Sequence, residues 1–456
     1  MKVIHQNDRL VVLLAVAILL AGGSCKKSFF TDANNNPNAP APTSIVPSVL
    51  LSTVEGALSY MQGGDLSRFA SLNTQQTFGS ARQAGGYYQY VYTSQDFDNA
   101  WGNIYTSTLE NDDALLTLSD ANGYNAYGGV ARILKAYTLQ LGVDTWGAIP
   151  YSDAFKGALN LKPKYDNDQA LYDTIANLLT TAITLLNSPN AGTLTPGGED
   201  IVYGGNKGGW IKFSHAIRAR LFLHQSKGSA TMATNALTEI NASFTSNSDN
   251  AQYIFGETET SANPWYQFNQ QRAGDISFSG GGVAAKMIAL HDPRLPILID
   301  TTAASGGDGL LYYGVINSPV EFITYDEMLF AKAEATLRSS GNVATAQGYY
   351  QGAIRANMEK LGVAGSDITT YLAANGVLPA TVDNAIAQVA TQEYLALYLN
   401  PEVWNLWRRT NSPALTPITG ANIPRRLLYP QTEYSYNGAN VPQGATLQAP
   451  KVFWDK

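Results

Sequence analysis

Two segments of the chain combine aromatic rings with short polar side chains, a combination suited to binding neutral polar ligands such as sugars. The first segment, Gln83–Asp96, reads QAGGYYQYVYTSQD and contains Tyr87, Tyr88, Tyr90 and Tyr92. If the segment is extended, the alternation of Tyr88, Tyr90 and Tyr92 places three rings on one side. The rings then either form a platform that stacks on a ligand or pack onto the body of the protein.

The second segment, Asn263–Arg272, reads NPWYQFNQQR. In it Trp265 and Tyr266 stand beside amide side chains such as that of Gln267, and Arg272 ends the run. Rings supply stacking faces, amides pair with hydroxyl groups, and a guanidinium binds hydroxyls or a carboxylate. This segment is a second candidate ligand-binding site. The competing interpretation is a structural turn that buries both rings.

Signatures of catalysis and of metal binding are missing from the sequence. No H-E-x-x-H, G-x-S-x-G or P-loop pattern occurs. His215, His224 and His291 show no zinc-site spacing. The adjacent acids at 112–113 and 326–327 would point about 100° apart on a helix, so neither pair can flank a scissile bond. We therefore predict a non-catalytic protein, with no catalytic residue, no metal ligand and no cofactor.

The N-terminus has the pattern of a bacterial lipoprotein signal. A short basic region precedes the apolar run Leu10–Ala21, which is shorter than the roughly 20 residues that a membrane-spanning helix needs. Small residues then lead to Cys25, the only cysteine in the chain. We predict a signal peptide at 1–24, acylation of Cys25 with palmitate among the attached chains, and an Asn/Pro/Ala-rich tether at 25–43. The competing interpretation is an ordinary secreted protein.

Composition limits the classes of partner. The chain has 456 residues, a formal charge of −7 and 14% charged residues, together with 26 tyrosines and 7 tryptophans. A nucleic-acid-binding protein would carry a basic stripe, so the acidic balance argues against that class. No later segment has the length and apolarity of a membrane span. The predicted contact with the membrane is therefore the lipid anchor.

Helical periodicity dominates the rest of the sequence. Between Gln169 and Leu186, for example, apolar residues recur at spacings of three and four, but between Asn241 and Pro319 Gly, Ser, Asn and Asp interrupt such patterns. We predict a mainly all-α fold of tetratricopeptide-like helix pairs, in a single domain over 44–456 with an irregular, loop-rich excursion at about 241–319. The expected helices are 45–61, 65–78, 98–118, 127–142, 169–186, 210–224, 325–337, 346–361 and 382–399.

Three segments read as structural corners rather than as ligand contacts. Asp144–Tyr151 (DTWGAIPY) ends an apolar helix with a glycine and a proline, and Trp146 is expected to pack beneath that corner. Trp404–Thr410 (WNLWRRT) places two arginines in a last helical turn, where the helix dipole favours cations. Ile423–Pro430 is an extended run bracketed by prolines. Buried arginines need carbonyl or carboxylate partners, which we expect nearby.

A set of short motifs follows the chain in a fixed order. They are NPN at 36–38, WGNIY at 101–105, DTWGAIPY at 144–151, YD at 165–166, YGG at 203–205, DPRL at 292–295, TY and AEA within 324–335, WNLWRRT at 404–410 and IPRRLLYP at 423–430. Each motif is weak by itself. The ordered set resembles the SusD/RagB family of Bacteroidetes outer-membrane lipoproteins, close to its SusD-like subgroup.

The resemblance implies a helical body with four tetratricopeptide-like pairs, anchored by lipid in the outer membrane and facing the cell exterior. It also implies a partner, a SusC-like TonB-dependent transporter. Proteins of this kind capture oligosaccharides, or in some members peptides, and act as a lid that delivers the cargo to the transporter. On this basis we expect a glycan-binding role in carbohydrate uptake.

Two other functions stay open. One is a peptide-binding lipoprotein with the same role as a lid. The other is a surface glycoside hydrolase, which would need two acids roughly 5 to 10 Å apart in a cleft. A bound calcium ion in the irregular excursion also stays open, although no loop has EF-hand spacing.

Overall fold

The computed structural model describes residues 46–302, 309–420 and 422–456. The predicted signal peptide, the acylation site Cys25 and the tether to residue 43 therefore lie outside the described residues. From Pro47 to Lys456 the chain forms one compact unit.

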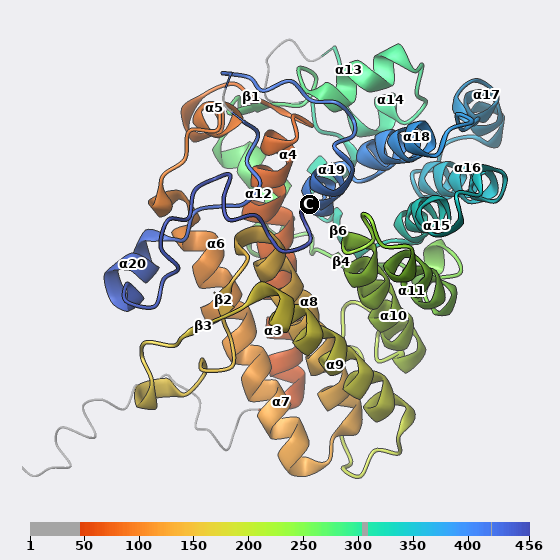
Figure 1. Ribbon diagram of the computed structural model, residues 1–456. Helices are drawn as coiled ribbons and strands as arrows, with labels where there is room; N and C mark the ends of the chain where they lie inside the picture. Colours follow the sequence, from red (N-terminus) through yellow and green to blue (C-terminus); the bar gives the residue numbers. More distant parts are fainter. Residues whose placement is uncertain (1–45, 303–308, 421) are drawn as a thin grey trace, which may run out of the picture. The chain divides into compact units, whose positions relative to one another are not determined.

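Helices make up most of this unit, which confirms the predicted all-α class (Figure 1). The α-helices are α3 Pro47–Met61, α4 Ser67–Asn73, α5 Arg82–Tyr88, α6 Asp98–Gly102, α7 Glu110–Asn122, α8 Asn125–Trp146, α9 Asp168–Asn187, α10 Lys207–His224, α11 Ala230–Ala242, α12 Pro264–Gln271, α13 Gly282–Ala289, α14 Leu295–Leu298, α15 Tyr325–Ser340, α16 Val343–Lys360, α17 Gly365–Asn375, α18 Val382–Ala396, α19 Glu402–Thr410 and α20 Gln431–Asn437. Short π- or 3-10-helical turns are η2 Gln62–Leu66, η3 Ser94–Phe97, η4 Asn103–Leu109, η5 Gly157–Leu159, η6 Asn247–Asp249, η7 Glu259–Ser261 and η8 Tyr312–Gly314.

Three short antiparallel ladders tie distant parts of the chain together. They pair β1 Phe78–Gly79 with β5 Ile276–Ser277, β2 Ile149–Pro150 with β3 Tyr165–Asp166, and β4 Ala251–Ile254 with β6 Pro319–Ile323. The first ladder joins the start of the helical body to the irregular excursion. This pairing determines where the two aromatic segments lie.

Helix α8 is the centre of the N-terminal half. Almost every residue from Ala126 to Trp146 is buried, because the helix packs against α7 on one side and α9 on the other. The helix is therefore interior on nearly all sides, and its buried polar groups need partners, such as Asp113 for Lys135. Gly129 permits the close approach of α9, since a Cβ there would lie 2.7 Å from the Cγ of Leu186.

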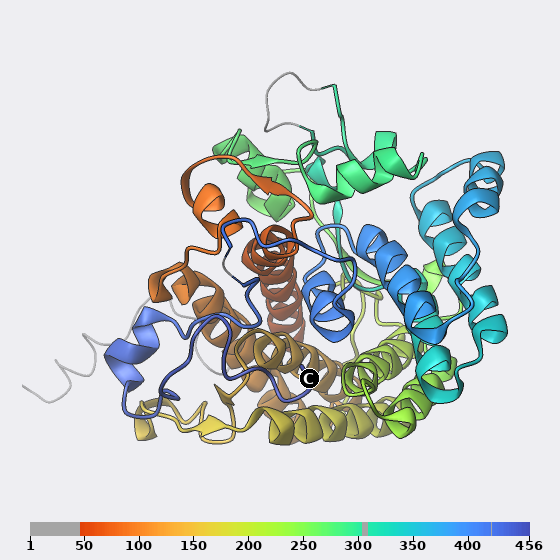
Figure 2. The ribbon, with the colours of Figure 1, turned by 45° about the horizontal axis from the view of Figure 1, so that its top comes forward.

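Consecutive helices then pack as pairs, α8 with α9, α10 with α11 and α15 with α16. Figure 2 shows the green to cyan helices α10, α11, α15 and α16 following one another along one side of the unit. The tight turn of the last pair depends on Gly341, whose φ of 67° suits glycine, and on Asn342, which caps α16 by accepting a hydrogen bond from the Thr345 amide at 2.9 Å. The predicted helix pairing is therefore confirmed.

The predicted helices differ from the observed ones mainly where helices are interrupted. The helix expected at 98–118 is three pieces, α6, the π-helical η4 and α7, and the helix expected at 65–78 ends at Asn73. Helices α11 and α17 were not among the predicted helices. Within the excursion at 241–319 the chain forms short helices and strands around α12, the eight-residue helix of the second aromatic segment.

Among the described residues, no helix combines the length with the apolar character that crossing a bilayer requires.

Candidate functional site

A cavity of about 630 Å³ lies where the two aromatic segments meet. The β1–β5 ladder joins the chain just before the first segment to the chain just after the second, while α5 packs on α4 and α12 packs on η2. This volume is within the range of small-ligand sites, roughly 300 to 1,000 Å³. The aromatic, amide and charged residues of its lining are Tyr60, Asp65, Arg68, Phe69, Gln83, Tyr87, Gln95, Asp96, Asn99, Asn103, Phe268, Gln271, Arg272 and Asp275.

One wall of the cavity is a cluster of rings around α5. Tyr87 stacks on Tyr92, with ring centroids 4.9 Å apart and planes inclined by 18°, and Phe69 packs against both rings. The Tyr87 hydroxyl donates a hydrogen bond to Oδ1 of Asp96 at 2.7 Å. Burial, together with the hydrogen bond and charge of Asp96, raises the pKa of Tyr87 well above its ordinary value, so this hydroxyl remains a donor at neutral pH.

Charged groups at the cavity are largely paired. Arg68 forms an ion pair with Asp65, and its guanidinium carbon lies 4.8 Å from the centroid of the Phe268 ring. Asp275 accepts a hydrogen bond from Nε of Arg82 at 2.5 Å. These pairs fix the orientation of the carboxylates and of the Phe268 ring, which stiffens the cavity wall.

Groups without protein partners are the ones available to a ligand. The side chain of Arg272 is exposed and has no hydrogen bond or ion pair with any residue in the described ranges. The amide side chains of Gln83, Gln95 and Asn99 are also exposed at the cavity. The arrangement offers donors, acceptors and ring faces within one hollow, as sugar binding requires.

The extended run predicted at Tyr88, Tyr90 and Tyr92 is wrong. Residues Arg82–Tyr88 form helix α5, so the three rings do not alternate on one side of a strand. Tyr90 is buried, with 6% of its surface exposed, and the Tyr92 ring stacks against the Tyr87 ring. Of the four predicted tyrosines, only Tyr87 lines the cavity.

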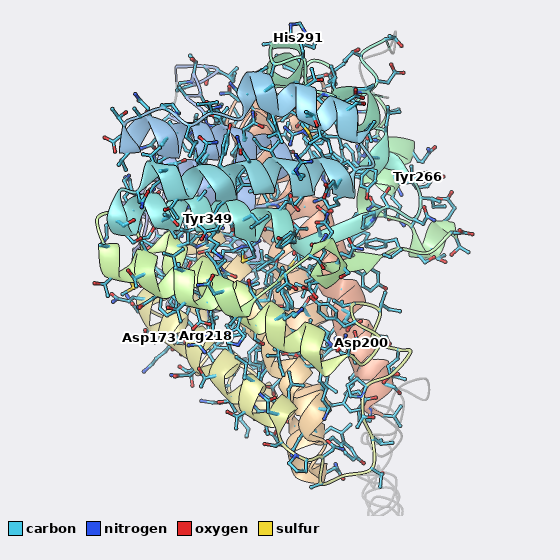
Figure 3. All side chains as sticks on the ribbon, turned by 90° about the vertical axis from the view of Figure 1, so that its right-hand side faces the viewer. Asp173, Asp200, Arg218, Tyr266, His291 and Tyr349 are labelled. Carbon is cyan, nitrogen blue, oxygen red and sulfur yellow. The ribbon has the colours of Figure 1, made fainter. Side chains whose placement is uncertain are left out.

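The second segment also divides into structural and cavity residues. Trp265 is only 2% exposed, so the prediction of an exposed tryptophan platform is wrong. The Tyr266 hydroxyl donates to Oε1 of Glu259 at 3.1 Å and the Gln267 amide donates to its carbonyl at 2.8 Å, and neither residue lines the cavity. Figure 3 shows Tyr266 at one edge of the molecule. Arg272 does line the cavity.

Sequence reasoning missed the contribution of Tyr60, Asp65 and Arg68. Tyr60 and Arg68 flank η2 and Asp65 lies within it, where Gly64 departs from helical geometry with φ of −94° and ψ of −108°. The pair Gly63-Gly64 lies between the helices expected at 45–61 and 65–78, and glycines at such a break can re-aim the neighbouring side chains.

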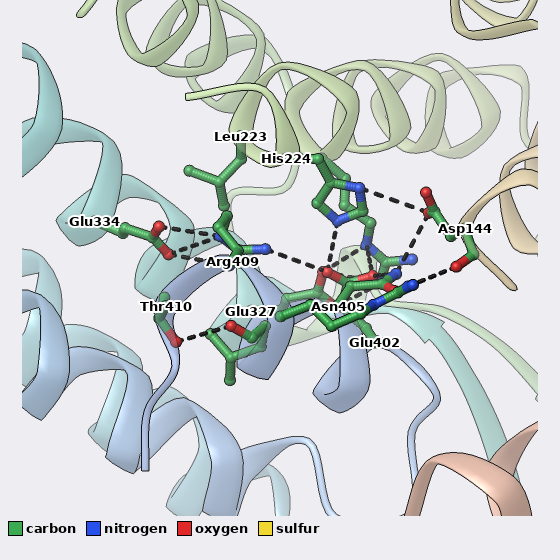
Figure 4. A network of polar contacts seen from close by, with 12 residues as sticks. Asp144, Leu223, His224, Glu327, Glu334, Glu402, Asn405, Arg409 and Thr410 are labelled. Carbon is green, nitrogen blue, oxygen red and sulfur yellow. Dashed lines mark hydrogen bonds and ion pairs between the residues drawn. The ribbon is translucent and has the colours of Figure 1, made fainter. Parts of the chain in front are cut away.

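Away from the cavity, the core contains a network of buried charges (Figure 4). Nε2 of His224 lies 2.8 Å from Oε1 of Glu402, and Nδ1 of His224 lies 3.5 Å from Oδ2 of Asp144. Arg409 forms a paired contact with Glu334, at 3.0 Å from Nε to Oε1 and 3.0 Å from the terminal nitrogen to Oε2. The network joins α8, α10, α15 and α19.

Asp144, His224 and Glu402 offer ligand atoms within 4.8 Å of one another, which is a possible metal-ligand set by composition. The surroundings do not suit an added cation, because Arg220 and Arg409 each lie 3.6 Å from a Glu402 oxygen. Positive charge is already supplied by the protein itself. We interpret this group as an ion-pair network that holds helices together. Carboxylate or carbonyl partners were expected for Arg409, but no sequence pattern identifies the other members, because they are far apart in the chain.

The predicted structural corners are confirmed. Helix α8 ends at Trp146, which is fully buried, and Gly147 turns the chain with φ of 79°. The buried Arg408 donates to the carbonyl oxygens of Asp144 at 2.5 Å and of Arg425 at 2.7 Å. Carbonyl partners thus bind both terminal nitrogens of this guanidinium, while its buried Nε has no hydrogen-bond partner among the described residues.

Comparison with known proteins gives a consistent result. Residues 37–430 match the model of a family described as SusD-like, starch-binding and associating with the outer membrane. No curated protein matches the chain. Among solved structures, a SusD/RagB family protein from Bacteroides thetaiotaomicron is similar with a TM-score of 0.73 and 22% identity, covering 90% of this chain and 99% of that one.

Two further solved structures are similar. A chitin-binding protein has a TM-score of 0.73 and 24% identity over 90% of this chain and 100% of its own. A SusD-like protein described as Bacteroidetes AC2a has a TM-score of 0.75 and 20% identity over 90% of this chain and 100% of its own. At these identities the likeness to solved structures establishes the fold.

Proposed function

Since the chain belongs to the SusD-like family of starch-binding proteins that associate with the outer membrane, we propose that it captures oligosaccharides in the cavity between α4, α5 and α12. In this proposal Cys25 is acylated, the lipid anchor holds the protein at the outer face of the outer membrane, and the cargo passes to a SusC-like TonB-dependent transporter. The protein performs no chemistry on the cargo.

The observation that carries the proposal is the chemistry of the cavity lining. Tyr60 is 45% exposed at the cavity, and a sugar ring can stack its C–H face on such an exposed aromatic ring. The amides of Gln95 and Asn99 and the guanidinium of Arg272 then supply hydrogen bonds to hydroxyl groups. The name of the chitin-binding protein with the same fold is consistent with a glycan ligand.

The way the acids at the cavity are paired supports the proposal of binding rather than hydrolysis. Asp65 is held by Arg68, and Asp275 by Arg82. Asp96 accepts from the Tyr87 hydroxyl and from the Thr93 amide and hydroxyl. Each carboxylate therefore has a structural task, and we assign none of them the role of general acid or base.

The test is calorimetric titration of the chain from residue 25 onward, carrying Cys25→Ala, with oligosaccharides of starch and chitin type and with peptides. Tyr60→Ala and Arg272→Gln should each weaken sugar binding roughly tenfold by removing one stacking face or one donor group. Both side chains are exposed, so the thermal stability should not change.

Tyr436→Ala is the matched control, because Tyr436 is 75% exposed and does not line the cavity. Equal losses in the Tyr60 and Tyr436 variants would place the ligand elsewhere. Binding of peptides with no response to sugars would overturn the glycan assignment in favour of a peptide cargo.

A further inference from the structure

The hairpin between β2 and β3 carries an apolar tip. Leu159 is 93% exposed and Leu161 is 77% exposed, more than any other large apolar residue in the described part of the chain. Single exposed apolar residues are common on protein surfaces. Two exposed leucines separated by one residue at the end of a projecting loop indicate a contact site, because burial in the fold does not explain them.

The hairpin is built to hold this tip in place. The β2–β3 ladder closes its base, and the Asn160 side chain donates to the carbonyl oxygen of Asp153 at 2.9 Å. On the outgoing arm, the Phe155 ring stacks on the Tyr105 ring at 6.3 Å. On the returning arm, the Asn437 amide donates to the carbonyl oxygen of Pro163 at 2.9 Å. Both arms are thus attached to the body, and the leucines between them have no such attachment.

The charged side chains near the tip are distributed so that exposed lysines lie beside the leucines and the acids lie toward the base of the hairpin. Lys162 and Lys164 are exposed, and their ammonium groups have no hydrogen bond or ion pair with any described residue. The nearby acids face the base of the hairpin: Asp166 accepts from the amides of Tyr151 and Ser152 at 2.8 and 2.7 Å. The third lysine of the hairpin forms an ion pair with Asp153. Free positive charge therefore stands beside the exposed leucines.

We propose that this hairpin tip rests on a lipid surface with anionic headgroups, as a membrane contact separate from the acyl anchor. Leu159 and Leu161 enter the interfacial layer, while Lys162 and Lys164 lie at the level of the headgroup phosphates. Lysine side chains beside inserted apolar residues can keep their stems in the apolar layer and their charges in the polar one. An anionic surface attracts each such lysine, so both lysines strengthen the contact.

This contact would orient the body relative to the membrane. An acyl anchor followed by an extended tether limits only the distance between protein and membrane, because the tether leaves rotation free. A second contact on the folded unit restricts that rotation. The proposal does not depend on the identity of the cargo, so titrations with sugars and with vesicles can fail independently of each other.

The test uses the chain from residue 25 onward with Cys25→Ala, so that no acyl chain contributes, in co-sedimentation with vesicles. Vesicles of phosphatidylcholine with about one third phosphatidylglycerol should bind it, and pure phosphatidylcholine vesicles should bind it much less. Leu159→Ser with Leu161→Ser should lower the binding to anionic vesicles roughly tenfold. Lys162→Gln with Lys164→Gln should lower it by a similar factor at low salt.

Val377→Ser is the matched control, since Val377 is 71% exposed and lies in a distant segment after α17. It should bind vesicles as the parent chain does, and all the variants should keep the parent's melting temperature. Absence of binding to anionic vesicles would overturn the proposal. So would a double-leucine variant that binds as tightly as the parent, and so would a loss in Val377→Ser as large as that at the tip.

Discussion

Nε2 of His224, at the end of α10, lies 2.8 Å from Oε1 of Glu402, at the start of α19, although the residues are 178 positions apart. Both side chains are buried, and Oδ2 of Asp144 lies 3.5 Å from the other imidazole nitrogen. The imidazole thus joins three helices through two carboxylates. Such a contact stabilises the fold most when the imidazole carries its proton.

The proton on His224 should make stability depend on pH. Burial lowers the pKa of His224, but the charges of Glu402 and Asp144 outweigh it, so the pKa is raised above its ordinary value. The stabilisation is complete below the unfolded pKa of about 6.5 and is lost as the pH rises through the folded pKa. His224→Gln should therefore cost more unfolding free energy at about pH 6 than at about pH 9, measured by urea denaturation. Equal costs at both values would contradict a protonated imidazole in the folded core.

Loss of Arg409 should destabilise the protein strongly. Arg409 and Glu334 are each 1% exposed, and Arg409→Leu would leave the Glu334 carboxylate buried with only Arg338 as a cationic partner. Breaking a buried ion pair from one side costs about 3–5 kcal/mol. Arg132→Leu, which breaks the outer pair with Asp120, should cost less than about 1 kcal/mol. Denaturant unfolding of the two variants compares these costs, and similar values would refute the structural role of Arg409.

Glu55 provides a pH response that substitution should remove. Burial, followed by the charge of Asp200, raises the pKa of Glu55 to about 10. The stability that Glu55 contributes through its proton is fully present below the unfolded pKa of about 4.5. It is lost as the pH rises toward the folded pKa, so the wild type loses stability over this range. Glu55→Gln should therefore be more stable than wild type at about pH 8, and the advantage should shrink toward pH ~5.

Glu199→Gln is a control for that experiment, because the pKa of Glu199 is shifted in the opposite direction from that of Glu55. Burial tends to raise the pKa of Glu199, but hydrogen bonds from Tyr127 and the backbone lower it overall. Its stabilising contribution is present above the unfolded pKa and is lost in acid. This variant should therefore lose stability relative to wild type most clearly near neutral pH. If both variants shift in the same direction with pH, the assignment of Glu55 as protonated is wrong.

Trp265 should report on folding and not on ligand contact. It packs on Phe278 with ring centroids 5.6 Å apart, and its Nε1 donates to Oγ of Ser67 at 2.9 Å. Trp265→Ala should cost about 3–5 kcal/mol of unfolding free energy, measured by denaturant titration. Trp265→Phe keeps most of the packing and should cost less while leaving sugar affinity unchanged. A stable Trp265→Phe protein that no longer binds sugar would contradict this prediction and indicate that the Trp265 ring contacts the ligand.

The failed expectation at Trp265 shows why sequence reasoning is weak on aromatic sites. A tryptophan in a polar, amide-rich run has the composition of a sugar platform, yet Pro264 and the Asn263 cap begin a helix that turns this ring inward. Asn263 accepts from the amides of Trp265 and Tyr266, which starts α12 at this point. Exposure depends on which helix face meets the neighbouring helix, and composition does not encode that.

Helical periodicity, the corner at Trp146 and the order of the short motifs could all be read from the sequence, because each depends on residues close together in the chain. The same local reading predicts the N-terminal signal and Cys25. The cavity could not be read in this way, since its lining comes from residues 60–103 and 268–276, which only the β1–β5 ladder and the packing of α12 on η2 bring together. Contacts between segments so distant in sequence arise from tertiary packing, and that packing determined which of the predicted aromatic residues face the cavity and which are buried in the core.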